Sequence, residues 1–437
     1  MRNRGFWTID WLKGRTVRKH YIDIKNTMQR KENVNKARES LQSLLTHATQ
    51  NCSFYAPFAN TPISEFPIID KDLIRSRHSE FLAKPFVNAK LHRMSTSGST
   101  GTPFSVVQNY EKRSRVLAEI VYFGELCGYT IGQRYAYIRS WNSQTRKSPL
   151  ESFLQNLIAI DTSRLDEESL ETMRSLLKRD KRLSCILGYA SSLDLLAQHL
   201  LEKGETPESF KRMKVVISGS ELLSDKARRN LKRVFGCNVV SRYSNQENGL
   251  IAQEVSDNVF LINRASYYLE FLKPNSNEHA RPGELSRIVL TDLFNYAMPM
   301  IRYDTGDLAI FEEDPIYGKV ITSIEGRTRD FVYDTQGRMV SPSTITVNMW
   351  QFDKLRQFQF VQEDSMRYVL RVNGAKDVYD DREFVTLIKN LVGKEAVVIV
   401  EHVEAIPQLR SGKFQAVVCN YDPGADRKVP MDMTIER

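Results

Sequence analysis

Apolar residues recur at helical spacing through much of the first ninety residues. In residues 34–52 they lie three or four positions apart, which predicts a helix with one buried face. Residues 66–82 form a second segment of this kind, in which Asp70 precedes the apolar run and is the expected N-cap. Residues 103–109 then alternate as a strand does. The N-terminal part is therefore predicted to contain helices separated by turns, followed by a strand.

The middle of the chain has the pattern of a βαβ unit. Residues 213–219 and 237–243 are β-branched runs, and a helical segment with Ser224 as N-cap and Gly236 as its end joins them. This order predicts parallel strands with a right-handed crossover. Ligands bind beyond the carboxyl ends of such strands, so we expect the polar segments 218–221 and 243–247 to lie together at one sheet edge.

The later pattern predicts a strand at 283–293 and a polar turn between two apolar runs at 298–311. Residues 325–339 are rich in charged and turn-forming residues and are the predicted domain boundary. Beyond them, segments typical of strands and helices alternate. A loop at 407–413 then leads into a last predicted strand. The expected fold class is α/β, with a large N-terminal domain built on parallel βαβ sheets and a small, mobile α+β C-terminal domain.

The composition narrows the functional classes. A length of 437 residues suggests two or three domains. The net charge of +9 is spread along the chain and is densest from Arg2 to Lys31. Since zinc-finger spacing, RNP-type aromatics and a basic heptad region are all missing from the sequence, we expect no nucleic-acid partner. The positive charge instead suits a polyanionic substrate such as ATP.

The N-terminal segment and the cysteines bear on localisation. Five apolar residues beside the N-terminal basic residues could enter a membrane interface, although packing against the protein itself is the preferred interpretation: Phe6, Trp7, Ile9, Trp11 and Leu12. The sequence shows neither a transmembrane run nor a secretory signal. Its five cysteines are odd in number and far apart, which predicts reduced thiols in a cytoplasmic protein.

Residues 95–103, STSGSTGTP, could form an anion-binding turn, because glycines let successive N–H groups approach a phosphate and hydroxyls add donors. The stretch lacks the GK[ST] ending of a Walker A loop, and alone it is more typical of a surface loop. Five further segments change its interpretation. In chain order the six are TSGSTGTP (96–103), SGSE (218–221), YSNQE (243–247), RYDTGD (302–307), GRTRD (326–330) and RSGK (410–413).

Together these segments resemble the core motifs of the adenylate-forming enzymes, the superfamily of acyl-CoA synthetases, peptide-synthetase adenylation domains and luciferases. They occur in the family's order and cover the chain from about residue 95 to 415. Three further segments are similar to the phenylacetate–CoA ligase branch, including its CapK-type capsular-polysaccharide relatives: FWTIDWLKG, FPIIDKDLIRS and ILGYASSLDLLAQHL. The resemblance implies a helical N-terminal part (1–90), an ATP- and acyl-binding core (91–328) and a C-terminal lid (329–437) that carries the catalytic lysine.

The resemblance also implies a role for each motif. The phosphate-binding residues would be Ser97, Gly98, Ser99, Thr100 and Gly101. The adenine and ribose would meet Gly219, Ser220, Glu221, Tyr243, Ser244, Asp307 and Arg327. Glu247 would hold Mg²⁺, Asp330 would be the hinge, and Lys413 would bridge the substrate carboxylate and the α-phosphate, where a cation offsets charge repulsion. Each residue alone could equally be a solvated or core group, but their joint occurrence in order favours a site.

Some positions depart from the family pattern. Ser244 stands where a glycine is usual, and Gln246 stands where a threonine is usual. Asp304 replaces a frequent arginine, and Arg302 is close enough in sequence to be its expected partner. The acyl pocket is predicted least well: Tyr137, Arg139 and Trp141 could line it, but a strand with a packed aromatic face is the slightly preferred alternative.

The expected activity is an ATP- and Mg²⁺-dependent carboxylate ligase. It would form an acyl-adenylate from a small carboxylic acid and pass the acyl group to CoA or to an amine, in the biosynthesis of a surface polysaccharide. A second hypothesis is transfer of AMP to a cofactor hydroxyl, as in synthetases of the same branch. A third is a non-catalytic nucleotide-binding partner in a biosynthetic complex, against which the retained Lys413 argues.

Overall fold

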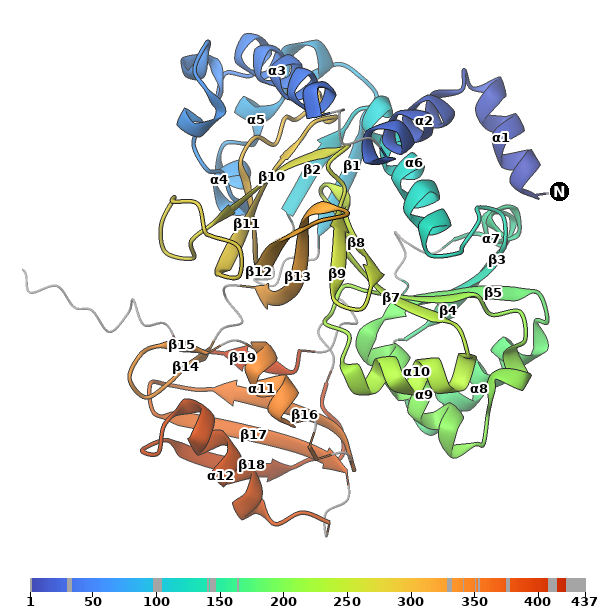
Figure 1. The fold of residues 1–437 in the computed structure, drawn as a ribbon, viewed down its shortest axis with the longest axis vertical. Coiled ribbons are helices and arrows are strands. Elements are labelled where there is room, and N and C mark those ends of the chain that lie inside the picture. Colours follow the sequence, from blue (N-terminus) through green and yellow to red (C-terminus); the bar gives the residue numbers. More distant parts are fainter. Residues whose placement is uncertain are drawn as a thin grey trace, which may run out of the picture. The chain divides into compact units, whose positions relative to one another are not determined.

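The structure is a computed structural model. It describes residues 2–29, 34–96, 104–139, 141, 147–162, 165–327, 332–340, 342–349, 351–352, 354–374, 378–407 and 415–421. The described residues fall into two compact units, one ending at Ile324 and the other beginning at Glu325 (Figure 1). The division falls at the start of the charged, turn-rich segment 325–339.

The first unit is organised around an eleven-stranded mixed sheet. In spatial order its strands are β10 (Tyr267–Leu272), β11 (Leu285–Asp292), β12 (Tyr303–Asp314), β13 (Gly318–Arg327), β9 (Val259–Ile262), β8 (Gly249–Ser256), β7 (Asn238–Asn245), β6 (Val215–Gly219), β5 (Leu183–Tyr189), β3 (Arg134–Arg139) and β4 (Leu157–Asp161). Strands β4, β3, β5, β6 and β7 pair in parallel, whereas β7 pairs antiparallel with β8. The predicted α/β class is confirmed, with an antiparallel half added to the expected parallel one.

The predicted βαβ unit is present as β6, α10 (Asp225–Phe235) and β7. Ser224 caps α10 by accepting the Ala227 N–H at 2.9 Å, and Gly236 ends the helix with a φ of +59°. In the parallel ladder Gly219 lies opposite Arg242, so the segments that follow β6 and β7 leave the sheet at the same edge. Helices α8 (Glu167–Arg179), α9 (Ala190–Glu202) and α10 pack on this half of the sheet, and α7 (Pro149–Gln155) precedes β4 (Figure 1).

Helices α1 (Arg2–Leu12), α2 (Thr16–Gln29), α3 (Val34–Asn51), α4 (Lys71–Ser76) and α5 (His78–Phe81) make up most of the N-terminal part. Short 3₁₀ helices occur at 56–58, 63–65, 84–86 and 207–210. The predicted cap is confirmed, because Asp70 accepts the Leu73 N–H at 2.8 Å. The hairpin β1 (His92–Thr96) and β2 (Phe104–Gln108) then leads into α6 (Tyr110–Leu126). No helix among these described segments, or elsewhere in the described chain, is long and apolar enough to cross a membrane.

The second unit has its own core. Its sheet has the order β18 (Val397–His402), β17 (Arg367–Gly374), β16 (Leu355–Gln362) and β19 (Val417–Cys419), beside the ribbon of β14 (Val332–Tyr333) and β15 (Met339–Val340). Helices α11 (Pro342–Met349) and α12 (Asp381–Val392) supply Ile345, Phe384 and Ile388 to the buried cluster. Asp380 and Glu383 form a capping box at the start of α12.

Candidate active site

A wide bulge in β12 presents Asp307. Arg287 of β11 pairs with Leu308, and Val289 pairs with Asp304, so three residues of β12 face one residue of β11. Gly306, inside the bulge, has a φ of +76°, a conformation that favours glycine. The sequence predicted a turn here, whereas the structure has one continuous strand. A bulge accommodates the same small and polar residues as a turn, but the strand stays paired with its neighbour. Bulges commonly redirect side chains next to active sites.

Tyr243 and Asp307 are joined by a hydrogen bond. The Tyr243 hydroxyl donates to Asp307 Oδ2 at 2.7 Å and lies 3.3 Å from Thr305 Oγ1. Thr305 in turn donates to the Ile288 carbonyl at 3.0 Å, which ties the bulge to β11. Two motifs that lie about sixty residues apart, YSNQE and RYDTGD, therefore meet at one point.

Glu247 lies beside them and is almost fully buried. Its Oε1 accepts a hydrogen bond from the Tyr303 hydroxyl at 2.7 Å and forms an ion pair with Lys71 Nζ at 3.0 Å. Its backbone carbonyl accepts from Gln108 Nε2 at 2.8 Å. Lys71 begins α4, directly after the N-cap Asp70. Lys71 was not predicted as a site residue. The sequence signal that could have indicated it is a lysine directly after the N-cap Asp70 in the FPIIDKDLIRS segment.

The two phenols of this cluster are donors, not ionised groups. Burial raises the pKa of the Tyr243 phenol well above its ordinary value, and the Asp307 and Glu247 carboxylates raise it further. Burial likewise raises the pKa of Tyr303, with Glu247 as the next cause. Both hydroxyls thus keep their protons and orient the two carboxylates, which leaves the carboxylates as the negative groups of the site.

A buried ionic network holds the backbone just after Glu247. The Tyr267 hydroxyl donates to the Asn248 carbonyl at 2.7 Å and accepts from Lys112 Nζ at 3.1 Å. Lys112 is fully buried and pairs with the equally buried Asp292 at 2.7 Å. Gly249 has a φ of +117°, and a Cβ there would lie 3.1 Å from the Tyr267 hydroxyl. The network therefore fixes the segment that follows Glu247.

The predicted pairing of Asp304 with Arg302 is wrong. Asp304 Oδ2 pairs with Arg287 at 2.7 Å, across the bulge from β11. Arg302 instead makes a buried two-pronged pair with Glu270 of β10, both bonds being 3.0 Å long. Residues two positions apart share a face of a regular strand, but Arg302 precedes β12 and has a φ of +52°, which breaks that alternation between Arg302 and Asp304. The Asp304 carboxylate is nonetheless paired with a cation.

The predicted adenine-side residues lie at the ends of β6 and β7. Gly219 ends β6, and Ser220 follows with a φ of +71°, a strained value for a residue with a side chain. Glu221 Oε2 accepts the Ser191 N–H at 2.8 Å, near the start of α9. Ser244 is exposed near the end of β7. The structure thus brings SGSE and YSNQE to one edge, as the topology predicted.

Tyr137, Arg139 and Trp141 gather at the carboxyl end of β3. The Tyr137 and Trp141 rings are 5.6 Å apart and edge to face, and the Arg139 guanidinium lies 5.4 Å from each ring. Trp141 Nε1 donates to the Ile160 carbonyl at 3.0 Å. These contacts form a compact aromatic surface around one cation. They fit the packed-strand interpretation and are also compatible with a pocket wall.

Comparisons with known proteins find relatives by sequence and by fold. Residues 332–420 match the family model of the CapK C-terminal domain. The chain is 22% identical to protein CapK of Staphylococcus aureus over 435 residues, covering 94% of each chain. It is also 30% identical to phenylacetate-coenzyme A ligase of Pseudomonas putida over 135 residues, covering 30% of each.

Among solved structures, a 2-hydroxyisobutyryl-CoA ligase in complex with 2-HIB-AMP in the postadenylation state has a TM-score of 0.71, at 17% identity over 91% of each chain. ATP-bound MatB from Rhodopseudomonas palustris has a TM-score of 0.54 at 18% identity, over 74% of this chain and 66% of MatB. The chain is similar to CapK over 94% of its length and has the fold of these solved ligases. The fold class and the family resemblance drawn from the six motifs are thereby confirmed.

Several residues predicted for the site lie outside the described residues: Ser97, Gly98, Ser99, Thr100, Gly101, Asp330 and Lys413. The backbone of Arg327 ends β13. The roles assigned to these residues therefore stay predictions. Those brought together in the structure are Glu247, Tyr243 and Asp307, with Lys71, Tyr303 and Thr305 added by the structure.

The side chains around Glu247 offer few ligands for a magnesium ion. Among the described residues, no group of three or more His, Cys, Asp or Glu side chains could hold a metal ion. Glu247 offers one buried carboxylate, whose Oε1 already contacts Lys71 and Tyr303. Mg²⁺ commonly binds through one or two carboxylates, with substrate phosphates and water as its other ligands. The site therefore fits an Mg²⁺ ion that arrives with the nucleotide and does not form a metal cage of its own.

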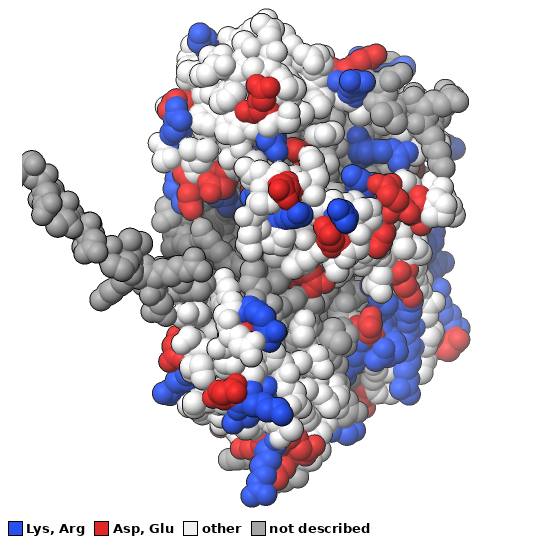
Figure 2. Space-filling view, turned by 60° about the vertical axis from the view of Figure 1, so that its left-hand side comes forward, with Lys and Arg blue, Asp and Glu red and all other residues white. Residues whose placement is uncertain are grey.

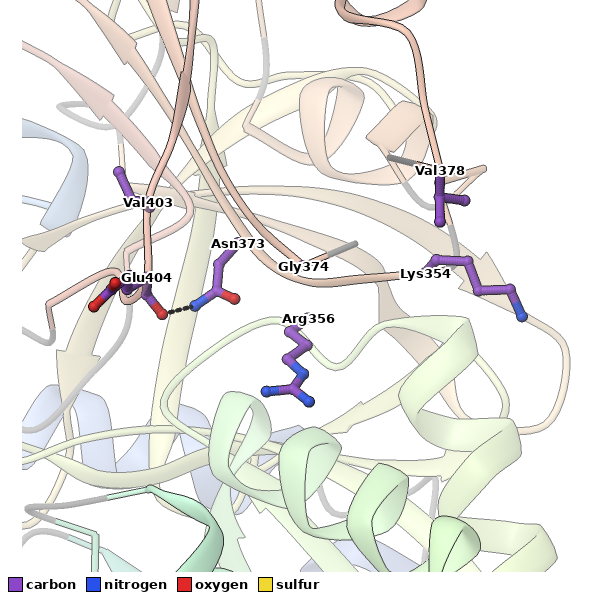
Figure 3. Close-up of a pocket in the computed structure, with 7 residues that line it drawn as sticks. All are labelled: Lys354, Arg356, Asn373, Gly374, Val378, Val403 and Glu404. Atoms are coloured by element: carbon purple, nitrogen blue, oxygen red, sulfur yellow. Dashed lines mark hydrogen bonds between the residues drawn. The ribbon is translucent and has the colours of Figure 1, made fainter. Parts of the chain in front are cut away.

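The second unit has a separate hollow of about 610 Å³, in the region that matches the CapK C-terminal domain model (Figure 3). Its lining residues are Lys354, Arg356, Asn373, Gly374, Val378, Val403 and Glu404. Asn373 Nδ2 donates to the Glu404 carbonyl at 2.5 Å and closes one wall. On the face in Figure 2, basic and acidic side chains both occur, and the basic ones are denser toward its right-hand edge.

Proposed function

We propose that this CapK-like chain is an ATP-dependent acid ligase that activates a small carboxylic acid as its adenylate and transfers the acyl group to CoA. The observation that carries the proposal is the cluster of Glu247, Tyr243 and Asp307, joined by Lys71 and Tyr303, at the sheet edge where β6 and β7 end. Relatives by sequence and by fold include named CoA ligases, and solved neighbours hold acyl-adenylates or ATP.

The first step couples the acid to AMP. A carboxylate oxygen of the acid attacks the α-phosphorus of ATP, the bond to the bridging oxygen breaks, and pyrophosphate leaves with that electron pair. Two negative groups must approach each other, so positive charge fixed in place lowers the barrier. Lys71 supplies such a charge at Glu247, and Lys413 is the proposed cation at the α-phosphate. Mg²⁺ held through Glu247 would neutralise phosphate charge.

Asp307 and Tyr243 are proposed to position the nucleoside. Asp307 presents a carboxylate from the bulge of β12, and a carboxylate accepts from two neighbouring ribose hydroxyls. The Tyr243 hydroxyl holds that carboxylate at 2.7 Å while its ring provides an apolar surface for the base. The proposed phosphate cradle is Ser97, Gly98, Ser99, Thr100 and Gly101, and the proposed adenine side is Gly219, Ser220, Glu221, Ser244 and Arg327.

The acceptor and pathway are the finer parts of the proposal. Thioester formation with CoA is the leading second step, with an amine of a surface-polysaccharide building block as the alternative acceptor. The similarity to CapK over 94% of the chain supports a polysaccharide role. The division into residues 1–90, 91–328 and a lid at 329–437 that carries Lys413, with Asp330 as hinge, is proposed together with a cytoplasmic location. Tyr137, Arg139 and Trp141 are the proposed acyl wall.

Pyrophosphate exchange into ATP tests the first step. The full chain, incubated with Mg²⁺ and a panel of aliphatic, aromatic and hydroxy acids, is expected to exchange pyrophosphate with at least one acid, and Lys413→Ala is expected to abolish exchange. ATP binding without exchange for any acid would contradict the proposal. Mass spectrometry of the products separates the alternatives: acyl-CoA and free AMP indicate ligation, whereas a stable AMP adduct indicates nucleotidyl transfer.

A further inference from the structure

One face of α1 is fixed to the rest of the first unit. The two carboxylate oxygens of Asp10 accept the Val17 and Arg18 N–H groups at 2.9 and 3.0 Å, at the start of α2. These are donors that a helix cannot satisfy by itself, and a carboxylate there also suits the helix dipole. The Trp7 ring packs on Tyr21 from the same side, with 5.7 Å between the ring centroids. The orientation of α1 is therefore set.

The other face of α1 presents large apolar side chains to solvent. Ile9, Trp11 and Leu12 are 53%, 55% and 71% exposed. Phe6 and Trp7, in contrast, pack against a buried cluster of the first unit. The two sequence-based interpretations of this segment, packing on the protein and contact with a membrane interface, therefore concern two different faces of one helix.

A second exposed apolar helix lies next to α1. Leu150, Phe153 and Leu154 of α7 are 67%, 64% and 64% exposed, and their spacing places them on one helical face. The Arg2 guanidinium lies 4.6 Å from the centroid of the Phe153 ring and donates to the Phe153 carbonyl. The two helices are adjacent in Figure 1. We call Ile9, Trp11, Leu12, Leu150, Phe153 and Leu154 the α1–α7 surface.

Uncompensated basic residues flank this surface. Within the described part of the chain, six exposed basic side chains of α1, α2 and their connection make no ion pair with a carboxylate: Arg4, Lys13, Arg15, Arg18, Lys19 and Lys25. Residues 2–29 contain only two acidic residues, Asp10 and Asp23. Asp10 is buried at the start of α2, and Asp23 pairs with Arg115 at 2.5 Å. The charges on α1, α2 and their connection are therefore mainly positive, while α7 adds the exposed Lys147 before it and the exposed Glu151 in its first turn.

We propose that the α1–α7 surface docks this chain on an anionic lipid bilayer. Aromatic and branched apolar side chains surrounded by Lys and Arg match the chemistry of a headgroup layer, in which apolar groups enter the acyl boundary while cations pair with anionic lipids. A soluble partner protein would need an apolar surface with an acidic rim, whereas a bilayer supplies both over the whole area. Since no described helix could span a membrane, the attachment is peripheral.

Vesicle binding of the full chain tests this. Sedimentation with vesicles of phosphatidylcholine alone is compared with vesicles in which a third of the lipid is phosphatidylglycerol. The expected result is about tenfold or stronger partitioning onto the anionic vesicles, weakened by salt. The combined variant Ile9→Ser, Trp11→Ser, Leu12→Ser is expected to lose about tenfold of this partitioning. Ile316→Ser, on the β12–β13 hairpin and 71% exposed, is the matched control and should bind unchanged.

Two further readouts separate docking from misfolding and from self-association. Brominated anionic lipids should quench tryptophan fluorescence in the wild type, and Trp11→Phe should remove most of that quenching while thermal unfolding stays unchanged. Light scattering without lipid should show the same mass for wild type and the triple variant. Equal binding to both vesicle types, unchanged binding of the triple variant, or a dimer that only the triple variant loses would each overturn the proposal.

Discussion

Lys71 Nζ lies 3.0 Å from Glu247 Oε1, and this pair joins the first turn of α4 to the loop that follows β7. The Glu247 side chain is 3% exposed and that of Lys71 is 30% exposed, so the carboxylate is largely withdrawn from water while the ammonium still reaches solvent. A residue from the N-terminal helical part therefore completes the charge arrangement of the candidate active site.

Removing that cation should lower adenylation strongly. Lys71→Ala leaves a nearly buried carboxylate with one partner fewer and removes positive charge from the proposed phosphate site. We expect pyrophosphate exchange to fall about a hundredfold, as when a single electrostatic donor is removed from an enzyme. Lys71→Arg should restore part of the rate because the charge returns. Lys84→Ala removes an exposed lysine of the same N-terminal part and should leave the rate unchanged; an equal loss in both alanine variants would refute a local role.

The pairing of Arg302 with Glu270 predicts which of two arginine variants is the less stable. Arg302→Ala strands the buried Glu270 carboxylate and should lower the free energy of unfolding by about 3–5 kcal/mol. Arg287→Ala leaves Asp304 partly exposed and should cost clearly less. Urea unfolding of both variants provides the measurement. If Arg287→Ala were the more damaging of the two, the pairing described for the bulge would not hold.

Two effects of replacing Gly249, steric crowding and its positive φ, can be separated by comparison with a second glycine. Gly249→Ala forces a Cβ to 3.0 Å from Val116 Cγ2 and 3.1 Å from Glu119 Oε2, at a φ of +117°. Gly318→Ala also has a positive φ, +73°, but its Cβ would meet nothing within 4 Å. We expect Gly249→Ala to lose about 1–3 kcal/mol more stability than Gly318→Ala, because the packed network must shift. Exchange activity should fall only in Gly249→Ala, since that network holds the segment after Glu247.

Glu205 should make the first unit sensitive to acid. Burial alone would raise the pKa of Glu205, but hydrogen bonds from Lys178, Ser209 and Arg174 lower that pKa from 4.5 to about 2. A carboxyl whose pKa is lower in the folded state stabilises fully above pH 4.5, and the contribution is lost as the pH falls from 4.5 towards 2. Glu205→Gln should therefore cost about 2–3 kcal/mol at pH 7.

The pH dependence supplies the check on Glu205. Urea unfolding between pH 7 and pH 3 should show the difference between Glu205→Gln and the wild type shrinking steadily below pH 4.5. Glu208→Gln is the control, because the Glu208 side chain is 81% exposed and its pair with Lys211 lies on the surface. A constant difference across this range would show that the hydrogen bonds, and not the carboxylate charge, account for the effect of Glu205.

The sequence predicted the elements that follow from local periodicity and capping. The strands and helix of the βαβ unit, the caps at Ser224, Gly236 and Asp70, and the meeting of the two polar segments at one edge were all anticipated. These features depend on neighbouring residues and on a chirality rule that applies to any parallel crossover. The family resemblance rested on motif order, which survives when most other positions change.

What the sequence did not predict depends on contacts between distant segments. The Lys71–Glu247 pair joins positions that no local pattern relates, and Arg287 and Asp304 meet only because β11 and β12 pair. A bulge and a turn also share composition, since both need a glycine with positive φ beside polar residues, so RYDTGD was assigned to a turn. Only the pairing of the flanking strands distinguishes them.

Strand β7 has a consequence for how the first unit melts. It pairs in parallel with β6 and antiparallel with β8, and its side chains enter three separate apolar clusters: Val239 in one, Val240 in another and Tyr243 in the third. Neither half of the sheet can come apart without removing a strand from the other, so heat should disrupt both in one cooperative event. The upper temperature limit of the proposed nucleotide site near Tyr243 is then set as much by the helices packed on the parallel half of the sheet as by the side chains of the site itself.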